Sequence, residues 1–275
     1  MNKIPKIAHF YWEGEGFSYL HYLSVRSFTK KNPDWTVKVH VNKEDISSFQ
    51  IPWATNEQKE KYTGKNYFNK LKELDLEIHE FDFTKLGVNP EAHPVLKSDI
   101  LRWYLLASEG GAWVDSDIIH LKPLSSLQEK IEPETDVVNV FNKDHYIIGF
   151  LMSSPSNKYF FNLFELASQV RGVDYQMFGN RLQMHLKQIG VLDSLSSEMN
   201  FHNLYVDSFY KYKWTDVNLI FNQSDESFKD DDVIGVHWFN GDNTSTKFCN
   251  KFDEFFEIVE GRTTIESIIH HEDRS

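Results

Sequence analysis

The chain has 275 residues, of which 40% are hydrophobic and 15% aromatic, enough for one large buried core. Its formal net charge of −12 argues against a nucleic-acid partner, because such proteins need an excess of lysine and arginine to displace counterions. No linker, repeat or low-complexity tract divides the sequence. We therefore expect a single domain over residues 1–275.

Export and membrane signals are not found in this sequence. The stretch MNKIPKIAHFYW has neither the apolar region nor the cleavage site of a signal peptide. The apolar run YIIGFLM is far too short to span a membrane. The single cysteine, Cys249, excludes an internal disulfide. These features predict a cytoplasmic protein without an integral membrane segment, which would reach a membrane surface only through a partner.

Strands and helices alternate in the first third of the chain. Segment 6–12 is apolar and β-prone, and 18–33 carries apolar residues at helical spacing. Residues 35–41 alternate as a strand does, 56–74 predict an exposed helix, and 76–83 return to the strand period. Such alternation is typical of an α/β fold.

A buried helix is predicted in the middle of the chain. The segment from Pro94 to Glu109, PVLKSDILRWYLLASE, is apolar on nearly all sides, with proline in its first turn and two glycines just past its end. A short strand, AWVD, follows. Later strands are predicted at 136–142, 146–153 and 232–239, and later helices at 157–170, 175–189 and 252–261.

Asp115 and Asp117 stand on either side of one serine at the end of that short strand. In an extended segment, residues i and i+2 point to the same side, so both carboxylates can aim at one spot. Two close carboxylates repel each other unless a cation or a proton lies between them. Mg²⁺ or Mn²⁺ suits oxygen ligands, and Mg²⁺ is commonly shared with substrate phosphates. The pair therefore indicates a divalent metal and a phosphorylated ligand.

Asp99 and Arg102 lie three residues apart, hence on one face of the predicted buried helix. One interpretation is a local ion pair, with Asp99 favoured near the helix N-terminus. The other is that a carboxylate and a planar guanidinium are held ready to bind hydroxyls or phosphate. The residues alone leave both interpretations open.

The segment HPVLKSDILRWYLLASEGGAWVDSDIIHLKPL resembles the signature of the DXD-containing sugar-transferase family. That family includes α-mannosyltransferases, capsular polysaccharide transferases and, more distantly, glucosylating bacterial toxins. The signature runs S-D-x-x-R, an apolar helix, Gly-Gly, an aromatic residue and D-x-D. Its elements are present in this order as Ser98, Asp99, Arg102, Gly110, Gly111, Trp113, Asp115 and Asp117. The opening KIPKIAHFYWEG also resembles the family's first strand, with His9 and Trp12 in matching places.

The resemblance implies a GT-A fold, a single α/β domain with a mostly parallel central sheet flanked by helices and with helical acceptor-side insertions. The nucleotide-sugar-binding core would comprise about residues 1–155 and 233–250, and the acceptor-side elements 42–75 and 170–232. The implied activity is retaining transfer of a hexosyl or N-acetylhexosaminyl unit from a nucleoside diphosphate sugar, most often a UDP-sugar, with Mn²⁺ or Mg²⁺. A glycan or glycolipid would accept the sugar, as in polysaccharide biosynthesis.

The resemblance also implies roles for single residues. Trp12 would stack on the base, while Asp99 and Arg102 would hold sugar hydroxyls and the diphosphate. Asp115 would face the ribose and the metal, and Asp117 would ligate the metal directly. From the residues alone, burial in the core is the alternative role for Trp12.

The C-terminal part of the signature departs from the family. His237, in VIGVHWF, matches a histidine that closes the metal site in many relatives. Those relatives carry a small residue and a tryptophan shortly after it, whereas here the chain reads HWFNGDNTSTKF. Asn243, Thr244 and Ser245 are the available substitutes, and Ser245 is expected to contact the diphosphate of the donor.

Two rival functions remain at this point. In a haloacid dehalogenase-type phosphatase, Asp115 and Asp117 would supply the nucleophile and the acid/base, with the acidic run 230–232 as a distal metal pair. That function would not explain Asp99 or Arg102. The other rival is a catalytically silent module that binds nucleotide sugars, for which the unusual loop after His237 is the supporting feature.

Overall fold

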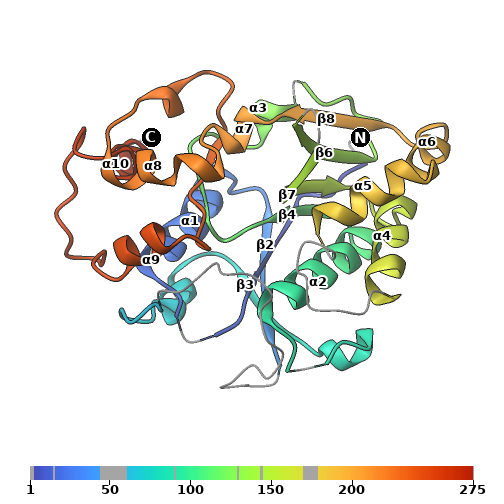
Figure 1. The fold of residues 1–275 in the computed structure, drawn as a ribbon, viewed down its shortest axis with the longest axis horizontal. Helices are drawn as coiled ribbons and strands as arrows, with labels where there is room; N and C mark the ends of the chain where they lie inside the picture. Colours follow the sequence, from blue (N-terminus) through green and yellow to red (C-terminus); the bar gives the residue numbers. More distant parts are fainter. Residues whose placement is uncertain are drawn as a thin grey trace.

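The computed structural model describes residues 3–14, 16–43, 61–89, 91–128, 130–142, 145–169 and 179–274. A central sheet within them has the strand order β3-β2-β1-β4-β7-β6-β8. Its strands are β1 (Ile7–Trp12), β2 (Thr36–Asn42), β3 (Glu77–Phe81), β4 (Gly111–Val114), β6 (Val137–Asn142), β7 (His145–Ser153) and β8 (Phe201–Tyr205). Among these seven, β7 alone runs antiparallel to the rest. The expected α/β architecture with a mostly parallel central sheet is confirmed (Figure 1).

Helices cover both faces of the sheet, because apolar side chains alternate along its strands. Phe10 of β1 packs in one buried cluster with residues of α1 (Tyr19–Lys31), and Tyr11 packs in another with residues of α2 (Pro94–Ser108). The α1 side also holds α8 (Val217–Asn222), α9 (Asn243–Cys249) and α10 (Thr264–Arg274), and the α2 side holds α4 (Lys158–Gln169) and α5 (Asn180–Gln188), as Figure 1 shows. The core therefore lies in two layers, one on each side of the sheet.

A second, two-stranded antiparallel sheet pairs β5 (Ile118–His120) with β9 (Gly235–His237). The expected strand over 232–239 is therefore shorter than predicted and lies outside the central sheet. It ends where the backbone of Phe239 takes a left-handed conformation, with φ of 58°, which turns the chain out of extended geometry. This small sheet brings β9 to the residues that directly follow β4.

The helix predicted at 252–261 is wrong. The backbone amide of Phe255 donates to the side chain of Asp253, and that of Phe256 donates to the Asp253 carbonyl, so a turn forms instead. Phe252 and Phe256 pack with the cluster on the α1 side. The closing helix is α10, which begins at Thr264.

Two other expectations fall partly outside the residues that the structure describes. Of the helix predicted over 56–74, residues 56–60 lie outside the described residues; within the rest, only the short 3₁₀ helix η1 (Phe68–Glu73) is helical, so the prediction of one long helix there is wrong. Of the acceptor-side elements expected at 42–75 and 170–232, residues 44–60 and 170–178 lie outside them as well.

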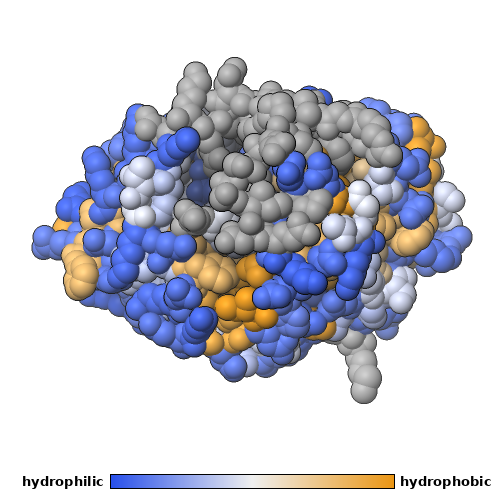
Figure 2. Space-filling view, turned by 90° about the horizontal axis from the view of Figure 1, so that it is seen from below, coloured by the Kyte–Doolittle hydropathy of each residue, from blue (hydrophilic) through white to orange (hydrophobic). Residues whose placement is uncertain are grey.

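The remaining short elements are η2 (Phe83–Leu86), α3 (Ser125–Gln128), α6 (Val191–Ser196), α7 (Asp207–Tyr210), η4 (Trp214–Asp216) and η5 (Ser227–Lys229). In the described part of the chain, no helix has both the length and the apolar character needed to cross a membrane. The face shown in Figure 2 is hydrophilic over most of its described surface, with hydrophobic residues gathered near its centre.

Candidate active site

The Gly110-Gly111 pair fixes the start of β4. Both glycines have left-handed backbones, with φ of 71° and 92°. A Cβ atom at Gly111 would lie 2.3 Å from the carbonyl oxygen of Ile7, and one at Gly110 would lie 2.6 Å from that of Ser153. Glycine is therefore required here for conformation and for close approach. The turn lets β4 enter the sheet between β1 and β7.

Arg102 connects helix α2 to the end of β4. Its Nη1 donates to Asp99 Oδ1 at 2.7 Å, and its Nη2 donates to Asp115 Oδ1 at 3.1 Å. The indole Nε1 of Trp113 donates to the same Asp115 oxygen at 2.8 Å, and the guanidinium lies 4.9 Å from the Trp113 ring centroid. The local ion pair expected at Asp99 is thus present, and the same arginine also orients Asp115.

Burial governs the electrostatics of Asp99. Asp99 and Arg102 are almost fully buried, whereas the side chain of Asp115 is 27% exposed. Burial raises the pKa of Asp99 to about 7, against the opposing effect of Arg102. Arg102 is therefore held between a deeply buried carboxyl group and one that reaches solvent.

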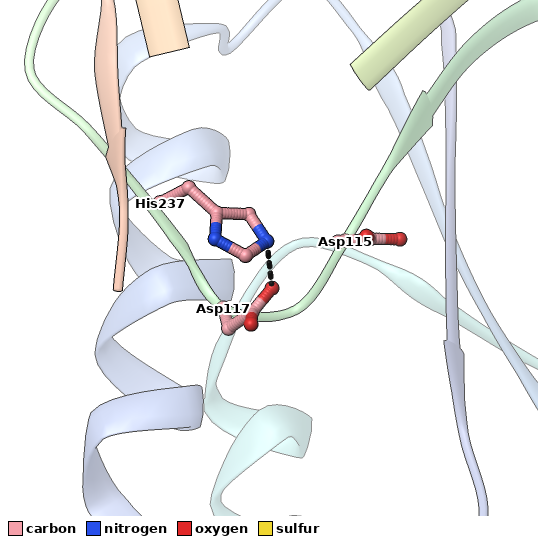
Figure 3. A group of neighbouring side chains, drawn as sticks. All are labelled: Asp115, Asp117 and His237. Atoms are coloured by element: carbon pink, nitrogen blue, oxygen red, sulfur yellow. Dashed lines mark ion pairs between the residues drawn. The ribbon is translucent and has the colours of Figure 1, made fainter. Parts of the chain in front are cut away.

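Asp117 and His237 form the other part of the site, across the two-stranded sheet. Ile118 pairs with His237 in that sheet, and the amide of Trp238 donates to the Asp117 carbonyl at 2.9 Å. As Figure 3 shows, the His237 ring points at the Asp117 carboxylate, with Nε2 and Oδ1 3.1 Å apart. The amide of Asn240 donates to Asp117 Oδ2 at 2.8 Å. Backbone pairing thus brings together two side chains 120 residues apart in sequence.

The Asp117–His237 pair shifts the pKa of both groups in opposite directions. Burial alone would raise the pKa of Asp117, but the neighbouring His237 and the hydrogen bond from Asn240 hold it below its usual value. Burial alone would lower the pKa of His237, but Asp117 raises it. Both shifts favour an ion pair in the absence of a metal.

A divalent metal fits the residues at this site. Asp115, Asp117 and His237 each offer one ligand atom, and these atoms lie within 4.8 Å of one another. In Figure 3 the Asp115 carboxylate points away from the Asp117–His237 pair. Two carboxylates and an imidazole suit Mn²⁺ better than Mg²⁺, because Mg²⁺ prefers an all-oxygen shell.

Tyr210 and Gly149 border the same cluster and were not predicted from the sequence. The Tyr210 ring stacks on His237 with centroids 4.7 Å apart. A Cβ atom at Gly149 would lie 2.1 Å from the Tyr210 hydroxyl oxygen and 2.7 Å from Asp115 Oδ2. Gly149 therefore leaves the room that Asp115 and Tyr210 occupy. In the sequence, the signal for Gly149 is its place inside an otherwise apolar strand, where a glycine often marks a close approach of another group.

Two cavities meet at this cluster. The smaller, of about 380 Å³, is lined by Trp12, Arg102 and the 113–117 segment among others. The larger, of about 910 Å³, shares Arg102 and Asp115 with the smaller one and extends along Tyr210 and His237. The residues expected at the site, Trp12, Asp99, Arg102, Asp115, Asp117 and His237, all line one cavity or both.

Ser245 is the expected site residue that the structure places elsewhere. It is fully buried in α9, and its hydroxyl donates to the Trp238 carbonyl at 3.1 Å. In this conformation it cannot touch a ligand in either cavity. The loop residues that line the smaller cavity are Asn240 and Gly241, which precede the helix.

The acidic run 230–232 lies away from the cluster. Asp230 pairs with Lys211 and Asp232 pairs with Lys130, and both carboxylates are exposed. Neither residue lines the two cavities. The distal metal pair required by the phosphatase alternative is therefore not formed by these residues.

Two carboxylates, an imidazole and a guanidinium thus gather beyond the strand ends of a mostly parallel α/β sheet, the place where open sheets of this kind bind ligands. Residues 20–138 match a protein family described as the glycosyltransferase sugar-binding region containing a DXD motif. The match confirms the resemblance to the DXD-containing glycosyltransferases over this segment, in which Asp115 and Asp117 are the two aspartates. Trp12 and His237 lie outside the matched segment.

Solved glycosyltransferase structures are similar to this chain at low identity. The PaToxG glycosyltransferase is 22% identical, with 71% of this chain and 74% of that chain covered and a TM-score of 0.47. The glycosyltransferase GlyE of Streptococcus pneumoniae TIGR4 is 12% identical, with 99% of this chain and 61% of that chain covered and a TM-score of 0.48. No curated protein matched the sequence. This chain thus spans 61% of the GlyE chain.

Proposed function

We propose that the protein is a metal-dependent glycosyltransferase. It would move a hexosyl or N-acetylhexosaminyl unit from a nucleoside diphosphate sugar, with a UDP-sugar as the proposed donor, to a hydroxyl group of a glycan or glycolipid. This proposal rests on one observation: Asp115, Asp117 and His237 each have a ligand atom within 4.8 Å of the others where two cavities meet, with Arg102 beside them. A donor with a nucleotide, a diphosphate and a sugar needs such adjoining spaces. The family match over 20–138 supports glycosyl transfer.

The smaller cavity would hold the nucleotide. Trp12 lines it at the end of β1, with its indole Nε1 donating to the Gly14 carbonyl at 3.0 Å and its ring packed on Phe17 and His21. These contacts fix the plane of the indole. A fixed aromatic plane at the end of a parallel strand offers a stacking surface for a base.

Asp115, Asp117 and His237 would hold the metal, and Arg102 would lie next to the diphosphate. Bound there, Mn²⁺ would neutralise charge that develops on the diphosphate when the anomeric C–O bond breaks. Arg102 is already oriented by Asp99 and Asp115, so it can stabilise the same charge without reorganising. Asp99, which lines the larger cavity, would accept a hydrogen bond from a sugar hydroxyl. Retention of configuration is proposed from the family resemblance alone.

Activity assays with nucleotide sugars test this function. We expect hydrolysis of, or transfer from, a UDP-sugar only with Mn²⁺ or Mg²⁺, and loss of at least about 100-fold in Asp117→Asn, which removes one charged metal ligand. The matched control is Asp232→Asn, an exposed aspartate whose change should leave the rate unaltered. Full activity in excess chelator, or an unchanged rate in Asp117→Asn, would overturn the metal-dependent proposal.

A further inference from the structure

The larger cavity is bordered by aromatic side chains that the fold leaves open to solvent. Trp214, in η4, is 45% exposed, and Tyr205, at the end of β8, is 66% exposed. Both line the cavity of about 910 Å³. Large rings carry much apolar surface, and two of them exposed beside one cavity are typical of a ligand site.

A continuous series of rings connects Trp214 with the metal cluster. The Trp214 ring meets Phe239 edge-on at 5.8 Å between centroids, and Phe239 meets His237 edge-on at 4.4 Å. Phe239 has a φ of 58°, a conformation that a bulky residue adopts only when its surroundings enforce it. This backbone turn directs the ring into the cavity lining. Trp214 thus forms the outer end of an aromatic wall that begins at His237.

Polar groups lie along the same wall. Lys213 and Thr215 flank Trp214 in sequence, and Asp207 follows Tyr205 by two residues, and all three line the cavity. Asp207 pairs with Lys211 and Thr215 donates to Asp216, but a hydrocarbon chain would cover these polar groups without offering them any hydrogen bond, which is costly. A sugar ring has an apolar C–H face and a rim of hydroxyls, so it can cover the aromatic rings and also hydrogen-bond these side chains.

We propose that Trp214 and Tyr205 form a stacking platform for a pyranose ring of the acceptor. This inference rests on the proposed function, because it assigns the donor sugar to the inner end near Asp99 and Arg102. The acceptor ring lies on the outer aromatic residues, with one hydroxyl directed toward Asp115. The cavity volume lies near the upper end of the roughly 300–1,000 Å³ usual for small-molecule sites, which leaves room for both rings.

Saturation-transfer NMR with simple glycosides tests the platform. The probes are methyl β-D-glucopyranoside, methyl β-D-galactopyranoside and methyl N-acetyl-β-D-glucosaminide, each with UDP and Mg²⁺ present. We expect at least one to bind, with saturation concentrated on the C–H protons of one ring face. Trp214→Ala should raise its Kd about tenfold, the effect of losing on the order of 55 Å² of apolar contact. Tyr205→Ala should raise it severalfold.

Two further variants make the result specific. Trp214→Phe keeps an aromatic face and should restore affinity to within about threefold of the wild type, given that the two rings share most of their contact area. Phe255→Ala removes an aromatic residue that is 86% exposed and lines neither cavity, and should leave the Kd unchanged. Thermal melting curves verify that each variant is folded.

The outcomes separate the platform from the proposed function. If no glycoside binds, if a tyrosine-containing peptide binds where glycosides do not, or if both alanine variants bind glycosides as the wild type does, the platform is overturned. If glycosides bind at Trp214 but UDP with Mn²⁺ fails to bind in calorimetry, the proposed function fails while the sugar site stands. If UDP binds with Mn²⁺ but no glycoside binds, the platform fails while the proposed function stands.

Discussion

The two cavities that meet at Asp115 are built from different kinds of chain segment. The smaller one is lined mainly by residues 11–13 and by the stretch from His93 to Asp117, which hold the motif residues. The larger one draws its lining from α2, β7, the start of α5, the end of β8, η4 and β9. A compact motif therefore builds the proposed nucleotide side, whereas the proposed acceptor side depends on how distant segments assemble. Substitutions on each side of the site test this division.

Arg102 belongs to both cavities, so its substitution should have the largest effect on activity. Lysine supplies one point charge and cannot donate to Asp99 and Asp115 in a fixed fork. We expect Arg102→Lys and Arg102→Ala both to lower kcat/KM by roughly 100-fold or more. Steady-state kinetics with a UDP-sugar measure this. Arg262→Lys is the matched control, at an exposed arginine that pairs with the buried Glu266 and lines neither cavity, and it should leave kcat/KM unchanged.

Equal activity of Arg102→Lys and the wild type would change the interpretation of this residue. Arg102 would then only balance the buried charge of Asp99, as a local ion pair does. Arg102 would then line both cavities without acting on a ligand in either of them.

Gly149 lies on the side of the larger cavity and should be almost as sensitive. In Gly149→Ala the new methyl group would collide with Tyr210 and with Asp115 Oδ2, so one of them must move. We expect kcat to fall by tens-fold, since a displacement of about 1 Å at a reacting site is costly. Gly261→Ala lies away from both cavities and adds a methyl group that meets nothing within 4 Å, but it strains a backbone with φ of 82°; it should lower the melting temperature without changing kcat. Wild-type kinetics in Gly149→Ala would show that Asp115 tolerates displacement.

Trp12 should affect the nucleotide side alone. Removing a stacking plane in Trp12→Ala should weaken UDP binding by about tenfold and leave kcat for the bound donor nearly unchanged. Trp12→Phe should bind UDP with an affinity between those of the wild type and Trp12→Ala. Calorimetry with UDP and Mn²⁺ gives these affinities. If Trp12→Ala binds UDP as tightly as the wild type, Trp12 is a core residue that packs on Phe17 and His21.

Ser245 should have the smallest effect on function. Ser245→Ala removes a buried hydrogen bond to the Trp238 carbonyl, so we expect a loss of about 1 kcal/mol in the free energy of unfolding. That corresponds to a melting temperature lower by roughly 2–4 °C. The KM for the donor should not change. A severalfold rise in KM without a change in melting temperature would support the ligand contact expected from the sequence.

Sequence patterns were informative wherever short-range order sets the structure. The helix over Pro94–Ser108, its end at Gly110 and the strand before Asp115 were predicted because proline, the glycine pair and apolar periodicity act locally. His237 was placed by resemblance, and the reason for its position, backbone pairing of β5 with β9, has no local signal. The same holds for Tyr210 and Trp214, which reach the site through tertiary packing.

The wrong helix at 252–261 has a related cause. Its apolar residues recur at a spacing that suits a helix, but Asp253 forms a turn by accepting from the amides of Phe255 and Phe256, and Phe255 is left exposed. Periodicity reports which residues prefer burial, while a single side-chain hydrogen bond decides the local backbone. Ser245 was misplaced for a similar reason, since α9 begins at Asn243 and buries it.

We propose above that His237 of β9 and Asp115 and Asp117, which follow β4, hold one metal ion. Pulsed electron paramagnetic resonance of the protein with Mn²⁺ and UDP tests it directly, because an imidazole nitrogen bound to Mn²⁺ gives a ¹⁴N coupling. We predict this coupling in the wild type and its loss in His237→Gln, with Mn²⁺ still bound through Asp115 and Asp117. A protein-bound Mn²⁺ without nitrogen coupling in the wild type, or the same coupling in His237→Gln, would contradict the account.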